Sequence, residues 1–184
     1  MNLEEFKRIV MERVFVLGTP QEPIALRGSN IYHDMPWIFD FRAITLDGSV
    51  LTYIAEAFWE RYENAYPFQV GGMESASIPL ITAIALKGHE RGTPIHAFFI
   101  RKSRKRDGLM KMFEGGLTDD PVILVDDLIN SGKSISKQVI MLAESGKRVT
   151  DVFTLLSFRS LNAFRFATKR DITVTTLLTL KDLG

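Results

Sequence analysis

The sequence predicts an α/β fold with a mostly parallel central sheet flanked by helices. Short apolar runs typical of buried strands alternate with helix-length amphipathic patterns along the chain. One of these runs, residues 122–125, leads through an acidic pair and a short polar turn into a helical pattern. We find no internal repeat, low-complexity tract or linker. The chain is therefore predicted to be one domain over 1–184, in which 1–45 form a small N-terminal hood.

Apolar residues at helical spacing alternate with short extended runs in the first half of the chain. Asn2 is a suitable N-cap, and glycines and prolines punctuate residues 17–36 as turns. The expected elements are a helix from Asn2 to about Val14, a strand over Trp37–Arg42, a helix over Ser49–Tyr62, a strand over Pro67–Gly71 and a helix over Ile78–Gly88.

The second half continues the alternation after one irregular segment. Residues 101–119 are rich in charge and glycine and show little periodicity, so no helix or strand is expected there. The expected elements are a strand over Pro94–Ile100, the strand that begins at Val122, a helix over Ile135–Ser145, a strand over Val149–Ser157, a short helix near Leu161–Thr168 and a strand over Ile172–Leu180.

Composition favours a cytoplasmic, soluble protein. The chain has 184 residues and a net charge of +1, which does not favour a nucleic-acid or membrane surface. The absence of cysteine excludes disulfides and thiolate sites. No apolar run approaches the roughly 20 residues that span a bilayer, and the first residues look like a charged helix. The three histidines are scattered, without metal-ligand spacing.

The most informative string is residues 122–134, VILVDDLINSGKS. Ligands of open α/β sheets bind at the carboxyl ends of the strands. Backbone N–H groups of a turn that opens a helix suit a phosphate, and Asp126 and Asp127 suit ribose hydroxyls with a divalent cation nearby. A sugar phosphate fits this pattern. Gly132-Lys133-Ser134 also resembles the end of a Walker P-loop, but that motif requires glycine where this chain has Asp127.

The same string resembles the phosphoribosyl pyrophosphate (PRPP) motif of type I phosphoribosyltransferases, and most closely that of orotate phosphoribosyltransferases. The resemblance covers most of residues 24–183. It implies that Asp126 and Asp127 orient the ribose and that Mg²⁺ bridges PRPP oxygens beside them. It also places the 5-phosphate of PRPP on the turn formed by Asn130, Ser131, Gly132, Lys133 and Ser134.

Two further segments resemble the parts of the family that hold the leaving pyrophosphate. The first is the strand-to-helix loop, with candidates Gly71, Gly72, Ser75, Ala76 and Ser77. The second is the basic loop, with Arg101 and Lys105 as catalytic candidates and Lys102 as a pyrophosphate ligand. The family pattern has a lysine where this chain has Ala76 and a histidine where it has Asp107. Without the family resemblance, the simpler interpretation is that the first segment is a plain strand-to-helix turn and the second a solvated charged loop.

The resemblance also indicates where the base binds. Arg159 follows the acidic pair at nearly the spacing of the arginine that grips the orotate carboxylate. Asn130, Phe39 and Arg27 are the other candidates, although Phe39 also fits a core position and Arg159 a surface ion pair.

These features predict a Mg²⁺-dependent glycosyltransferase that moves the phosphoribosyl group of PRPP to orotate, giving orotidine monophosphate and pyrophosphate. The resemblance implies a homodimer in which a mobile loop, 101–119, reaches the partner's site. Two alternatives stay open: a related transferase that uses another base, and a non-catalytic protein that senses PRPP or nucleotides.

Overall fold

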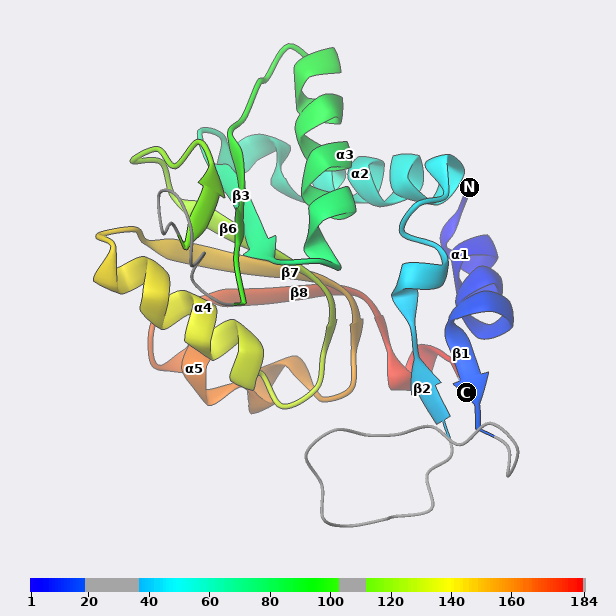
Figure 1. The fold of residues 1–184 in the computed structure, drawn as a ribbon. Coiled ribbons are helices and arrows are strands. Elements are labelled where there is room, and N and C mark those ends of the chain that lie inside the picture. The colour runs from blue at the N-terminus through cyan, green and yellow to red at the C-terminus, as the bar shows by residue number, and fades with distance from the viewer. Residues whose placement is uncertain (19–36, 103–111, 184) are drawn as a thin grey trace.

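The computed structural model describes residues 1–18, 37–102 and 112–183, and its centre is a six-stranded sheet (Figure 1). The strand order is β5-β4-β3-β6-β7-β8, and all neighbours are parallel except β5, which is antiparallel to β4. The strands are β3 (Gln69–Met73), β4 (Ala97–Ile100), β5 (Phe113–Gly115), β6 (Val122–Ile129), β7 (Val149–Ser157) and β8 (Thr173–Thr179). The predicted α/β class is confirmed.

Helices cover both faces of this sheet (Figure 1). One face carries α2 (Gly48–Tyr62) and α3 (Ser77–Glu90), and the other carries α4 (Lys133–Glu144) and α5 (Arg165–Thr168). The central strand β6 contributes to both cores, because successive side chains of a strand point to opposite faces. Ile123 and Val125 pack into the core under α2 and α3, and Leu124 packs into the core under α4.

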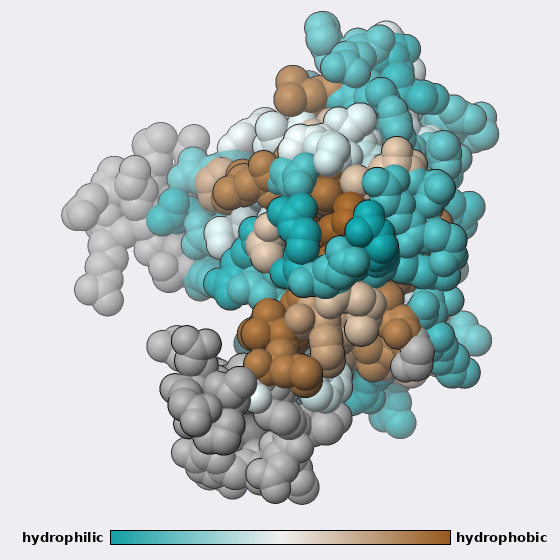
Figure 2. Space-filling model, turned by 90° about the vertical axis from the view of Figure 1, so that its right-hand side faces the viewer, coloured by the Kyte–Doolittle hydropathy of each residue, from teal (hydrophilic) through white to brown (hydrophobic). Residues whose placement is uncertain are grey.

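The N-terminal segment forms a hood at one end of the sheet, beside the C-terminus (Figure 1). It contains α1 (Leu3–Ile9), a π-helical turn (Val10–Val14), and the antiparallel strands β1 (Phe15–Leu17) and β2 (Trp37–Phe39). Figure 2 views the molecule from this side and shows apolar residues gathered in the lower part of a largely hydrophilic surface. Four 3₁₀ turns complete the described structure: Phe41–Ala43, Glu63–Ala65, Leu161–Ala163 and Leu180–Asp182.

Several elements differ from the predictions in their bounds, and the following four differences bear on the site. The strand expected over Trp37–Arg42 ends at Phe39, because the Asp40 carboxylate accepts from the Arg42 backbone N–H and turns the chain. The segment 101–119 contains β5, which pairs with the edge of β4. Strand β6 continues through the acidic pair to Ile129. Helix α4 starts at Lys133, directly after Gly132 with its φ of 73°. None of the helices within the described ranges is long and apolar enough to cross a membrane.

Candidate active site

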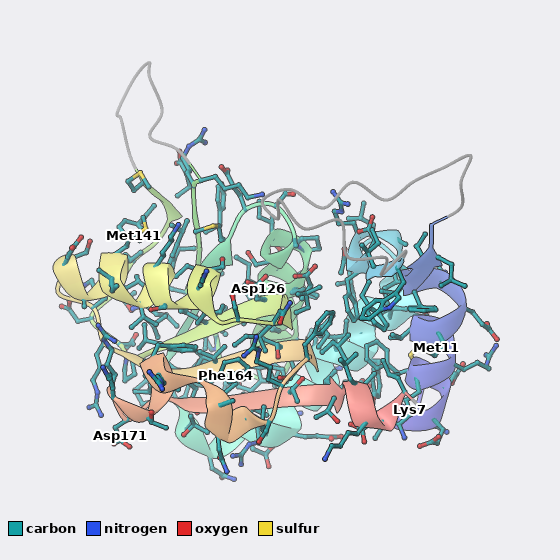
Figure 3. All side chains as sticks on the ribbon, turned by 90° about the horizontal axis from the view of Figure 1, so that it is seen from below. Lys7, Met11, Asp126, Met141, Phe164 and Asp171 are labelled. Carbon is teal, nitrogen blue, oxygen red and sulfur yellow. The ribbon has the colours of Figure 1, made fainter. Side chains whose placement is uncertain are left out.

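A pocket of about 390 Å³ opens at the carboxyl ends of β3, β4 and β6, where β2 and the turn after it form one wall. In Figure 3, Asp126 lies between α4 on one side and the hood on the other. The pocket is lined by Ile38, Phe39, Asp40, Arg42, Met73, Glu74, Ser75, Ala76, Lys102, Asp126, Asp127, Leu128 and Ser134. Residues far apart in the sequence therefore meet at this edge, as expected for open α/β sheets.

The acidic pair is at the base of this pocket, in the carboxyl-terminal half of β6. The backbone N–H of Asp127 donates to Oδ1 of Asp126 at 3.0 Å, and the N–H of Leu128 donates to Oδ1 of Asp127 at 2.9 Å. Burial, and then the charge of Asp127, raise the pKa of Asp126 well above its usual range. Burial also raises the pKa of Asp127, but its hydrogen bonds oppose this. Ionisation of both carboxyls is therefore less favourable in the pocket than in water.

The hood contributes an ion pair that the sequence reasoning missed. Arg42 donates from Nε to Oδ1 of Asp40 at 2.7 Å and from Nη2 to Oδ2 at 2.8 Å. The bonded guanidinium lowers the pKa of Asp40, so this carboxylate stays ionised at neutral pH. Phe39, which is 9% exposed, belongs to the core and also lines the pocket. The sequence feature that could have indicated this ion pair is the presence of two opposite charges, Asp40 and Arg42, directly after the aromatic strand.

The residues predicted to hold pyrophosphate divide into two groups. Ser75 and Ala76 line the pocket. Gly71, Gly72 and Ser77 are buried, and the Ser77 hydroxyl donates to the Met73 carbonyl at 2.6 Å. A Cβ at Gly71 would lie 2.2 Å from the Phe98 ring, so strand packing by itself demands this glycine.

The start of the basic loop reaches the same pocket. Lys102 lines it, and its backbone N–H donates to Oε1 of Glu74 at 2.8 Å. The Arg101 guanidinium lies 3.7 Å from Glu114 on β5. Lys105 and Asp107, like Arg27 in the N-terminal segment, lie outside the described residues.

The predicted phosphate turn borders two hollows. Ser134 lines the acidic pocket, while Ser131, Gly132 and Lys133 line a neighbouring hollow of about 460 Å³ together with Arg159. Asn130 is exposed just after β6. Arg159 is thus beside the turn and is not among the residues that line the acidic pocket.

The donor set suits a magnesium ion that arrives with a phosphorylated substrate. Within the described ranges, no group of three or more histidine, aspartate or glutamate side chains is arranged to hold a metal. Mg²⁺ usually binds through one or two carboxylates plus substrate phosphates. Asp126 and Asp127 provide that number of carboxylates in the pocket.

This fold and site define the class: they are those of a type I phosphoribosyltransferase. No protein-family model matches the chain. The chain is similar to the orotate phosphoribosyltransferase of Corynebacterium glutamicum (31% identity over 149 residues, covering 80% of this chain and 79% of the relative). It is also similar to that of Bradyrhizobium sp. ORS 278 (32% over 123 residues, 64% of this chain), where the match spans a little under two thirds (66%) of the relative. The chain belongs to the orotate phosphoribosyltransferase family.

Solved structures agree with this assignment. A phosphoribosyltransferase from Corynebacterium diphtheriae superimposes with a TM-score of 0.78 at 26% identity, over 99% of this chain and 98% of that one. An orotate phosphoribosyltransferase from Mycobacterium tuberculosis, in complex with Fe(III) dicitrate, gives 0.74 at 25% identity over the same shares. The same enzyme in complex with PRPP gives 0.62 at 28% identity, over 79% of this chain and 82% of that one.

Proposed function

We propose that this protein transfers the phosphoribosyl group of PRPP to orotate, giving orotidine monophosphate and pyrophosphate. The observation that carries this proposal is a single pocket that contains the acidic pair Asp126 and Asp127, the cations Lys102 and Arg42, and Ser134 of the phosphate turn. Family membership supports the reaction class, and the PRPP complex of the Mycobacterium tuberculosis relative supports PRPP as the donor.

The charges in the pocket suit the chemistry of this transfer. The bond between the anomeric carbon and pyrophosphate breaks as the base nitrogen attacks, so negative charge grows on the leaving group and positive charge on the ribose. In this proposal, Asp127 and Asp126 hold the ribose hydroxyls and face the positive ring. Lys102, which lines the pocket, would neutralise the departing pyrophosphate, an effect that typically contributes about 10²–10³ in rate per donor.

Mg²⁺ fits this scheme as an ion carried by PRPP and held in part by Asp126 and Asp127. It would supply further neutralisation of the pyrophosphate charge. The family resemblance also supports a cytoplasmic homodimer in which the loop 101–119 reaches the partner's site. Light scattering of the purified protein, with and without PRPP, tests the dimer.

One observation favours a second candidate, a related transferase that uses another base. Arg159, the arginine expected to grip the orotate carboxylate, borders the hollow beside the phosphate turn instead of the acidic pocket. A base without a carboxylate would not need that contact.

The test is pyrophosphate release from PRPP and Mg²⁺, with orotate and then with a panel of other bases. The Asp126→Asn/Asp127→Asn double variant is the control for specific turnover. Orotate-dependent release that the control loses supports the proposal, and release with another base alone supports the second candidate. Binding of PRPP without release for any base would contradict both and indicate a sensor.

A further inference from the structure

A row of polar side chains crosses the sheet at the level of the acidic pair. Asp126 on β6 is paired with Thr154 on β7, which is paired in turn with Thr176 on β8. Paired residues of neighbouring parallel strands point to the same face of a sheet, so these three side chains are neighbours. The rows two residues before and after them are wholly apolar: Leu124–Val152–Val174 and Leu128–Leu156–Leu178. Hydrophobic packing therefore does not account for the polar row between them.

Thr154 is the fully buried member of this row. Its hydroxyl has no hydrogen-bond partner within residues 1–18, 37–102 and 112–183. The Thr176 hydroxyl, in contrast, donates to the Leu178 carbonyl at 2.8 Å. Burial of a hydroxyl without a partner is destabilising, and valine would fill nearly the same space without that cost. Stability of the fold therefore does not explain a threonine at position 154.

The Asp126 carboxyl is within reach of this hydroxyl. Neighbouring strands lie about 4.8 Å apart, so side chains of paired residues can meet by rotation about their own bonds. Within the described ranges, the N–H or O–H donor bonded to the Asp126 carboxyl is the backbone N–H of Asp127, at Oδ1. The χ2 torsion of aspartate has broad minima, so one bond leaves the plane of the carboxyl free to turn. A second donor would fix that plane.

We propose that Thr154 is a positioning residue, whose hydroxyl donates to the Asp126 carboxylate once the ribose of the substrate occupies the pocket. The bond fixes the plane in which Asp126 meets the ribose hydroxyls and the positive ring of the transition state. Hydrogen bonds in active sites often tighten only in the substrate complex. The inference rests on the proposed function, because Thr154 acts through Asp126 in that reaction.

Gln138 provides the alternative partner for this hydroxyl. It is among the residues that α4 buries, and neither its amide oxygen nor its amide nitrogen has a partner in the part of the chain that the structure describes. A bond between Thr154 and this amide would tie the sheet to α4 and leave Asp126 unaffected. Gln138→Met separates the two roles, because it keeps the length of the side chain and removes its polar atoms.

The test compares two variants that change the hydroxyl and the methyl group of Thr154 separately. Steady-state pyrophosphate release is measured on the intact protein with the base that wild type uses, together with melting temperatures. Thr154→Val is expected to lower kcat about 10- to 100-fold, as for a lost hydrogen bond to a charged group. Its KM for PRPP should stay unchanged, and its melting temperature should equal or exceed that of wild type.

Thr154→Ser is the conservative variant that keeps the hydroxyl. It is expected to retain a kcat close to that of wild type while its melting temperature falls, because the lost methyl group leaves a cavity. Activity and stability then change in opposite directions in the two variants. A purely structural role for Thr154 would make them change together.

Thr176→Val and Gln138→Met are the controls and should keep the kcat of wild type. The inference is overturned if Thr154→Val keeps full kcat, or if Thr154→Ser loses as much as Thr154→Val. An equal loss in Thr176→Val would assign the effect to packing of the row, and an equal loss in Gln138→Met would assign it to α4. Failure of the proposed function looks different: wild type then releases no pyrophosphate with orotate, and if no other base supports release the inference fails with it.

Discussion

The backbone N–H of Asp127 donates a hydrogen bond to Oδ1 of Asp126, with 3.0 Å between the two atoms. This contact fixes the Asp126 carboxyl against the backbone of Asp127, and both half-buried residues line the pocket. Burial and the adjacent negative charge together make ionisation of Asp126 unfavourable in the folded protein. The site thus carries a stability cost at the pH where such enzymes work.

Asp126→Asn is expected to make the protein more stable at neutral pH while it reduces turnover. The folded-state pKa of Asp126 is raised, so the native state binds this proton more tightly than the unfolded chain does. Stability therefore falls as pH rises from the unfolded pKa, near 4, through the raised value. Asparagine removes this decline. Urea unfolding between pH 4 and pH 8 should show that the free energy of unfolding of Asp126→Asn exceeds that of wild type by an amount that grows with pH. A variant that is less stable than wild type by the same amount at every pH would contradict the raised pKa of Asp126.

Alanine at the strand glycines is expected to destabilise the fold. A Cβ at Gly72 would lie 2.3 Å from the Val125 carbonyl oxygen, and one at Gly71 would lie 2.2 Å from the Phe98 ring. Overpacking of this kind costs about 1–3 kcal/mol, and Gly72→Ala should cost more because backbone yields less than a side chain. Gly48→Ala is the matched control, since nothing lies within 4 Å of its Cβ. Thermal melts that leave all three unchanged would refute this explanation.

The elements that the sequence predicts best are those with strong local patterns. The run before Asp126 combines four buried apolar residues with a turn and a helix, so a buried strand followed by a helix can be predicted from this local pattern alone. Strands β1 and β5 were missed because each has three residues and exists through pairing with a neighbour. Such short strands leave no periodicity to read.

The site was predicted less completely than the fold. Ligand pockets are assembled from residues that tertiary structure brings together, and Asp40 and Arg42 come from a turn with no motif of its own. Arg159 lies in the bend that follows β7, where strand alternation no longer fixes the direction of a side chain. Spacing along the chain could not tell that Phe158, and not Arg159, approaches the aromatic rings of the hood.

Alanine substitutions at two serines of the loop between β3 and α3 should affect PRPP binding and stability separately. Ser75 is exposed and lines the pocket, while the buried Ser77 donates its hydroxyl to the Met73 carbonyl. Ser75→Ala is expected to raise the KM for PRPP about five- to tenfold, as for a lost hydrogen bond, without a change in melting temperature. Ser77→Ala is expected to cost about 1 kcal/mol of stability and leave that KM within about twofold. The reverse pattern would show that Ser77 contacts the ligand.

Glu74→Gln is expected to tighten PRPP binding. Glu74 lines the pocket with a negative charge, and its Oε1 accepts the Lys102 backbone N–H at 2.8 Å. Glutamine keeps a carbonyl acceptor for this bond and removes the charge that repels a polyanion. One unit charge about 4 Å away in water is worth about 1 kcal/mol, so the KM for PRPP should fall about fivefold, and less at high salt. Glu63→Gln, in the turn after α2, is the control and should leave the KM unchanged. A KM that rises in Glu74→Gln would mean that the carboxylate itself serves the substrate, for example by sharing its magnesium ion.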